Sequence, residues 1–152
     1  MELDPHVLHV AIRWLHVAAM ATAFGGAISV LVLSARPGVT SSSAVVAVAV
    51  RYEWLFWAAA GVLAMTGIGN LAAFGAALLG PATSWGTTLL LKLGSVLALV
   101  VLSLPRTLAV ARINASIGVN AQASVAPLRN LYAATTGAFA VILALAVWLA
   151  HG

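Results

Sequence analysis

The stretch HVLHVAIRWLHVAAMATAFGGAISVLVL, residues 6–33, is the first long apolar run of the chain and decides its class of fold. It is longer than the ~20 helical residues that cross about 30 Å of hydrocarbon. Three further apolar runs follow, at roughly 54–79, 87–110 and 128–150. Because backbone groups cannot stay unpaired in lipid, each run is predicted to be a helix. We therefore expect an all-α, integral membrane four-helix bundle that forms one domain over residues 1–152.

The composition indicates that lipid is the solvent of these helices. Hydrophobic residues make up 63% of the 152 residues and charged residues only 7%, against about 25% charged residues in soluble domains. Cysteine is absent, which excludes disulfides, thiolate metal ligands and cysteine nucleophiles. The chain has no basic face that would follow a phosphate backbone, so we expect a lipid bilayer and no nucleic acid as its partner. We find no nucleophile–base–acid set, and enzymatic activity stays open.

The arginines predict the direction of the helices. The second connection carries no charge. The first and third connections are assigned five arginines: Arg36, Arg51, Arg106, Arg112 and Arg129. Basic connections favour the cytoplasmic side of a membrane. Both termini are therefore predicted to lie on the extracytoplasmic side of a multi-pass protein in the cell inner membrane.

Three local features carry smaller expectations. The stretch TSSSAVVAVAVRYE, residues 40–53, fits either a loop or an early start of the second helix. Pro105 should kink the third helix or mark its inner end, because proline removes a helical hydrogen bond. Glu53 is expected to pair with Arg51 or a neighbouring arginine at the inner end of the second helix.

A polar ridge marks the outer half of the first helix. At 100° per residue, His9 and His16 align within about 20°, and Arg13 falls on nearly the same stripe. Ionisable groups within a span usually face the bundle interior or a wet cavity. We therefore expect the ridge to point inward, toward Asn70 and Lys92 at a similar depth on other helices.

This ridge predicts a site for a prosthetic group or a metal ion. Imidazole ligates haem iron and copper, and the cations Arg13 and Lys92 suit the carboxylates of haem propionates. His151, at the outer end of the fourth helix, is a third candidate metal ligand beside His9 and His16. The complete expected site is His9, Arg13, His16, Asn70, Lys92 and His151.

Three motifs add a resemblance to known families. RWLHVAAMATAFGG at 13–26, AMTGIGNL at 64–71 and TTLLLKLGSVLALVVL at 87–102 resemble the copper-resistance D (CopD-like) membrane domain. They are also similar to HemJ-type haem-associated membrane proteins. By position, His16 matches the helix-one histidine and Lys92 the helix-three lysine of these families. The resemblance implies b-type haem in the second family and copper uptake or tolerance in the first.

Three functions stay open. The favoured interpretation is a protein that binds haem b at an outer-leaflet site with a redox or small-molecule role, ligated by His16 or His9. The alternative is copper binding or transport by His6, His9, His16 and Met20, because imidazole and thioether groups bind copper. The third is an assembly subunit whose polar ridge docks a partner helix. A homodimer or a redox partner protein is a further expectation.

Overall fold

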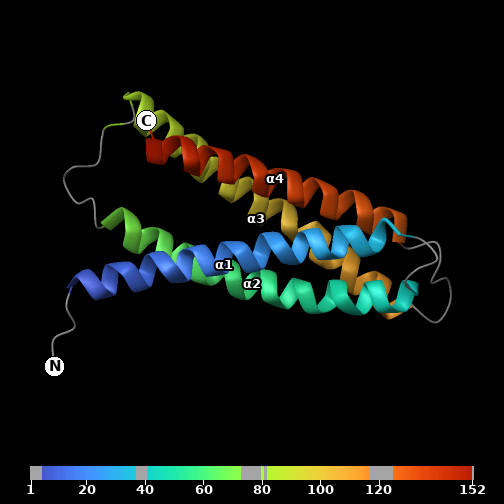
Figure 1. Cartoon of the computed structure of the whole chain (residues 1–152). Helices are drawn as coiled ribbons and strands as arrows, with labels where there is room; N and C mark the ends of the chain where they lie inside the picture. Colours follow the sequence, from blue (N-terminus) through green and yellow to red (C-terminus); the bar gives the residue numbers. More distant parts are fainter. Residues whose placement is uncertain (1–4, 37–40, 73–79, 81, 117–124, 152) are drawn as a thin grey trace.

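Four long helices account for nearly all of the chain that the structure describes. The computed structural model describes residues 5–36, 41–72, 80, 82–116 and 125–151 (Figure 1). The helices are α1 (Pro5–Ser34), α2 (Ser42–Ala72), α3 (Ser84–Ser116) and α4 (Val125–His151). Each of the four is long and apolar enough to cross a membrane. The predicted all-α class with four membrane-spanning helices is confirmed.

The second helix begins at Ser42, earlier than the predicted residue 54. Ser41 explains this start, because its carbonyl accepts the Val45 N–H at 3.1 Å and its Oγ accepts the Ala44 N–H at 3.3 Å. A serine in this role caps the unpaired N–H groups of a helix N-terminus. The ambiguous stretch 40–53 is therefore helical from Ser42 onward, and the predicted last part of this helix, residues 73–79, lies outside the described residues.

The third helix is longer than predicted at both ends. Thr83 caps its start by accepting the Gly86 N–H with its Oγ1 at 3.0 Å. The helix then runs through Pro105 to Ser116, so that Pro105 does not end it. The bounds of α1 and α4 lie within a few residues of the predicted ones.

The helices pack side by side as two antiparallel pairs. α1 contacts α2 most extensively and also packs against α4, while α3 packs against α4 and α2. Large apolar side chains cover the outward faces, among them Trp54, Leu97, Leu102 and Trp148. Such faces are favourable in hydrocarbon, and the protein is accordingly a multi-pass membrane protein.

Burial divides the bundle into two halves along its length. The packed half comprises residues 19–34, 42–59, 99–116 and 125–142, and it holds the apolar core. The loose half comprises residues 5–18, 60–72, 84–98 and 143–151, and its only described buried residues are Thr66 and Gly86. In Figure 1 the helices spread apart toward the left, where α1 begins, α4 ends and the loose half lies.

Candidate functional site

His16 lies on the interior face of α1, in the loose half. At 100° per residue it falls within about 20° of Ala23 and Ala27, which are both buried. Its Nδ1 lies 2.8 Å from Oγ1 of Thr66 on α2. The Thr66 hydroxyl donates to the Val62 carbonyl at 2.7 Å. Because a threonine hydroxyl has one proton, His16 Nδ1–H then donates to Thr66, and Nε2 keeps its lone pair for a ligand.

Lys92 on α3 faces the same interior space. At 100° per residue, it falls within about 40° of the buried stripe of α3, made of Leu99, Ser103, Arg106 and Val110. Lys92 is half-buried. The structure therefore joins His16 and Thr66 directly and places Lys92 on the interior face of a third helix.

Asn70 lies one turn beyond Thr66 on the interior face of α2. At 100° per residue it has about the same angular position as the buried Tyr52. Its Oδ1 is buried and has no hydrogen-bond partner in the described part of the chain. A buried acceptor without a donor is uncommon and is available to a ligand or a water molecule.

The other predicted site residues lie apart from this place. Arg13 and His6 are exposed, whereas His9 is half-buried on the same stripe of α1 as His16. His151 is exposed, and its Nδ1 lies 2.9 Å from the Val147 carbonyl of its own helix. No group of three or more His, Cys, Asp or Glu side chains that could hold a metal ion occurs among the residues that the structure describes.

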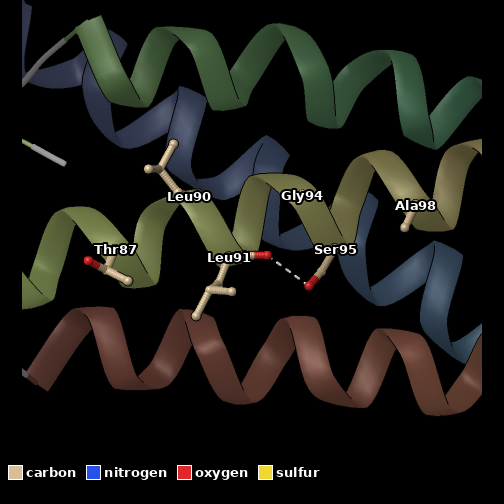
Figure 2. Close-up of a pocket in the computed structure, with 6 residues that line it drawn as sticks. All are labelled: Thr87, Leu90, Leu91, Gly94, Ser95 and Ala98. Atoms are coloured by element: carbon tan, nitrogen blue, oxygen red, sulfur yellow. Dashed lines mark hydrogen bonds between the residues drawn. The ribbon is translucent and has the colours of Figure 1, made fainter. Parts of the chain in front are cut away.

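A shallow hollow on the outer face of α3 offers no ligands. It has a volume of about 450 Å³ and is lined by Thr87, Leu90, Leu91, Gly94, Ser95 and Ala98 (Figure 2). The Ser95 hydroxyl donates to the Leu91 carbonyl at 2.8 Å, and the Thr87 hydroxyl donates to the Thr83 carbonyl at 3.0 Å. Both hydroxyl groups of the hollow thus donate to backbone carbonyls four residues earlier in the chain, and we do not assign the site to it.

A second polar cluster lies in the packed half, and the sequence analysis expected only its pair of Glu53 with an arginine. Glu53 on α2 receives two hydrogen bonds from Arg106 on α3, Nε to Oε1 at 2.9 Å and Nη2 to Oε2 at 3.1 Å. The Tyr132 hydroxyl on α4 donates to Oε1 at 2.7 Å, and the Thr107 hydroxyl donates to Oε2. Arg106 Nη1 also donates to Thr135 Oγ1 at 2.9 Å. We call these five residues the Glu53–Arg106 cluster.

Aromatic rings enclose the charged pair. The guanidinium carbon of Arg106 lies 4.4 Å from the ring centre of Phe56, 5.3 Å from that of Tyr52 and 5.4 Å from that of Tyr132. Arg106 is only 1% exposed and Glu53 only 5%. Two buried charges are costly unless their geometry is good and their remaining hydrogen-bonding groups are satisfied. Both conditions hold here, and the cluster ties α2, α3 and α4 together.

This cluster and the helix bounds refine the assignments made from the sequence. The expected pairing of Glu53 with an arginine is confirmed, and the partner is Arg106 of another helix, whereas Arg51 is exposed on α2. Arg106 was counted with the third connection although the predicted span 87–110 contains it, and it is buried inside α3. Arg51, Arg112 and Arg129 were also counted with the connections, but they lie within α2, α3 and α4. A signal was present, because an ionisable residue inside a span is by default a candidate functional residue.

The comparisons with known proteins identify one family. A family model described as Copper resistance protein D matches residues 46–149, about two thirds of the chain. The match includes Glu53, Asn70, Lys92 and Arg106, whereas all four histidines lie outside it. No curated protein and no solved structure matches the chain. The findings thus support the first of the two resemblances, and none of them supports the HemJ-type resemblance or haem b.

Proposed function

Because the chain belongs to the copper resistance protein D family, we propose that it binds copper ions within the membrane and passes them on, with His16 as the principal ligand. Copper, the alternative in the sequence analysis, thus replaces haem b as the ligand. The histidines also argue against a haem held between His9 or His16 and His151, because His151 is exposed and bonded to its own helix.

The orientation of His16 carries this proposal. Its Nδ1 is held by Thr66 on the neighbouring helix, so that Nε2 is left free to bind a ligand. A ligating histidine usually has its second nitrogen fixed by such a hydrogen bond. Met20 follows one turn later on α1 and packs against the core. An imidazole and a thioether on one face suit Cu(I), because soft sulfur ligands select this ion.

The other polar groups near His16 are consistent with copper that is bound weakly and passed on. The described residues contain no group of three or more His, Cys, Asp or Glu side chains around one point, so tight storage of copper is not favoured. A protonated Lys92 on the interior face of α3 would weaken the binding of a cation in the loose half and favour its release. His9, about two turns nearer the start of α1 on the same stripe, provides an earlier imidazole for the ion.

We propose that the loose half faces the extracytoplasmic side of the inner membrane. Three exposed arginines support this direction, because they lie at or near the far end of the packed half: Arg36, Arg112 and Arg129. A fourth exposed arginine, Arg51, lies within the packed half, nine residues after the start of α2. Basic residues accumulate at the cytoplasmic ends of spans. Copper would accordingly enter the loose half from the extracytoplasmic side of the membrane.

Copper binding by the purified protein tests the proposal. We expect Cu(I) affinity, measured against a competing chelator, to fall about tenfold or more in His16→Ala. Thr66→Val keeps the shape of the side chain but removes the hydroxyl that orients His16. We expect it to weaken binding by about 10- to 100-fold, which is the usual cost of losing a group that orients a metal ligand.

His151→Ala is the matched control, because His151 is exposed and lies away from the site. We expect its Cu(I) affinity to equal that of the unchanged protein. An affinity that does not change in His16→Ala would refute the assignment of His16. A Soret band in the purified protein would refute the copper proposal in favour of haem.

A further inference from the structure

The Glu53–Arg106 cluster lies deeper in the bundle than His16, between the interior faces of α2, α3 and α4. Along α2, Glu53 is about 20 Å from Thr66, and along α3, Arg106 is about 21 Å from Lys92, at 1.5 Å per residue. Arg106 and Lys92 also share the interior face of α3, as described above. An ion that moves inward from His16 between the helices therefore meets this cluster.

The cluster closes the interior of the packed half. Glu53, Arg106 and Tyr132 are at most 5% exposed, and Phe56 and Phe139 are each 2% exposed. Phe139 packs against Phe24 of α1 with ring centres 5.9 Å apart and against Phe56 of α2 at 6.4 Å. Side chains of all four helices thus meet around the charged pair.

An ion pair is an unusual choice for a permanent barrier. Replacing a buried ion pair with apolar side chains is often neutral or stabilising, so packing alone does not call for charges here. The two charges are stabilised in both states of the bundle. They bind each other when the helices are packed together, and they are hydrated when the helices separate. Apolar side chains would instead disfavour a hydrated, separated state.

Glu53 has a second property that bears on ion passage. It is the only carboxylate side chain among the described residues. A copper ion that leaves His16 for the packed half would therefore meet one anionic group, and this group is held by Arg106. The charge of the ion would compete with the guanidinium for the same carboxylate oxygens.

We propose that the Glu53–Arg106 cluster is a lock, which holds the packed half closed and must separate for an ion to pass beyond His16. Breaking the cluster would release α2, α3 and α4 from one another in a single step, since the pair and its hydrogen bonds come from these three helices. The purpose of this lock rests on the proposed copper function, but its main test uses no copper.

Cysteine labelling tests the lock, and the natural chain contributes no cysteine to the background. Ala59 is 7% exposed and lies on α2 between Glu53 and Thr66. We would place a single cysteine there (Ala59→Cys), reconstitute the protein in liposomes and add a membrane-impermeant maleimide on the side of Arg36. Labelling should be slow with the intact cluster and about tenfold faster or more in Glu53→Gln, because the amide does not neutralise Arg106.

Three controls make the result specific. Arg36→Cys, at an exposed position on the same side, should be labelled rapidly in every background. Tyr132→Phe removes one hydrogen bond to Glu53 but keeps the ion pair, and it should accelerate labelling of Ala59→Cys only a few-fold. The double variant Glu53→Leu with Arg106→Met should fold, stay closed to the maleimide and lose copper transfer in cells.

The outcomes separate this inference from the proposed function. Equal labelling in Glu53→Gln and in the unchanged background would overturn the lock, as would normal copper transfer by the apolar double variant. If Glu53→Gln fails to fold, the double variant and Tyr132→Phe decide the matter in the same assays. Faster labelling without His16-dependent copper binding would remove the copper proposal and leave the lock in place.

Discussion

Gly26 allows the closest approach between α1 and α2. A Cβ atom added at this glycine would lie 2.6 Å from Cδ2 of Tyr52. The tyrosine ring has little freedom to move, because its hydroxyl donates to the Ala23 carbonyl at 3.0 Å and its face contacts Arg106. The absence of a side chain at Gly26 thus leaves the space that the Tyr52 ring occupies beside the charged pair.

We expect Gly26→Ala to destabilise the protein by about 1–3 kcal/mol, the usual cost of overpacking a core. Thermal unfolding in detergent micelles measures this change. Gly25→Ala is the matched control, because an added Cβ at Gly25 has no neighbour within 4 Å. Equal melting temperatures for the two variants would contradict the role of Gly26.

At the scale of the helices, the starts of α2 and α3 are set by single capping residues. Ser41 and Thr83 each accept a backbone N–H from the residue three positions later, at 3.3 Å and 3.0 Å. The Thr83 hydroxyl also donates to the Gly80 carbonyl at 2.7 Å, which fixes the end of the preceding connection. Such caps satisfy N–H groups that a membrane environment would leave costly.

Loss of the α3 cap should be measurable. We expect Thr83→Ala to lower the stability by about 1 kcal/mol, as removal of an N-cap commonly does. Hydrogen exchange at the Gly86 amide, which loses its acceptor, should become faster. Thr83→Ser keeps the hydroxyl and should leave the exchange rate unchanged. Fast exchange in the serine variant too would show that the hydroxyl is not the determinant.

At the scale of the whole molecule, the two halves of the bundle have different physical character. The packed half contains the apolar core and the ion pair, and exposed arginines lie toward its end. The loose half contains His16, Lys92 and Asn70, with almost no buried residues around them. This asymmetry gives the proposed ion path an accessible side and a closed side.

The proposed orientation in the membrane predicts which positions a reagent reaches in intact cells. Arg36 and Gly80 are exposed and lie at opposite ends of the bundle. A membrane-impermeant maleimide should label Gly80→Cys at least about tenfold faster than Arg36→Cys, since basic ends stay in the cytoplasm. Permeabilised cells should label both variants. The reverse preference in intact cells would invert the orientation and the direction of copper entry.

The helices show which structural features hydropathy alone predicts and which it does not. All four spans were predicted, because an apolar run long enough to cross hydrocarbon is a property of contiguous residues. The sequence left the start of α2 open, because a serine-rich stretch followed by valine and alanine is compatible with either a loop or a capped helix. Arg106 was misplaced for a related reason, since a charge inside an apolar run looks like the end of a span.

By itself, the sequence determined the number and class of the helices and placed His9 and His16 on one stripe of α1. These properties depend on length, hydropathy and the 100° period of a single helix. Only the tertiary structure decided that His16 meets Thr66, 50 residues away, and that Glu53 meets Arg106, 53 residues away. Such pairs depend on how each helix is rotated against its neighbours, and no single-helix pattern contains that information.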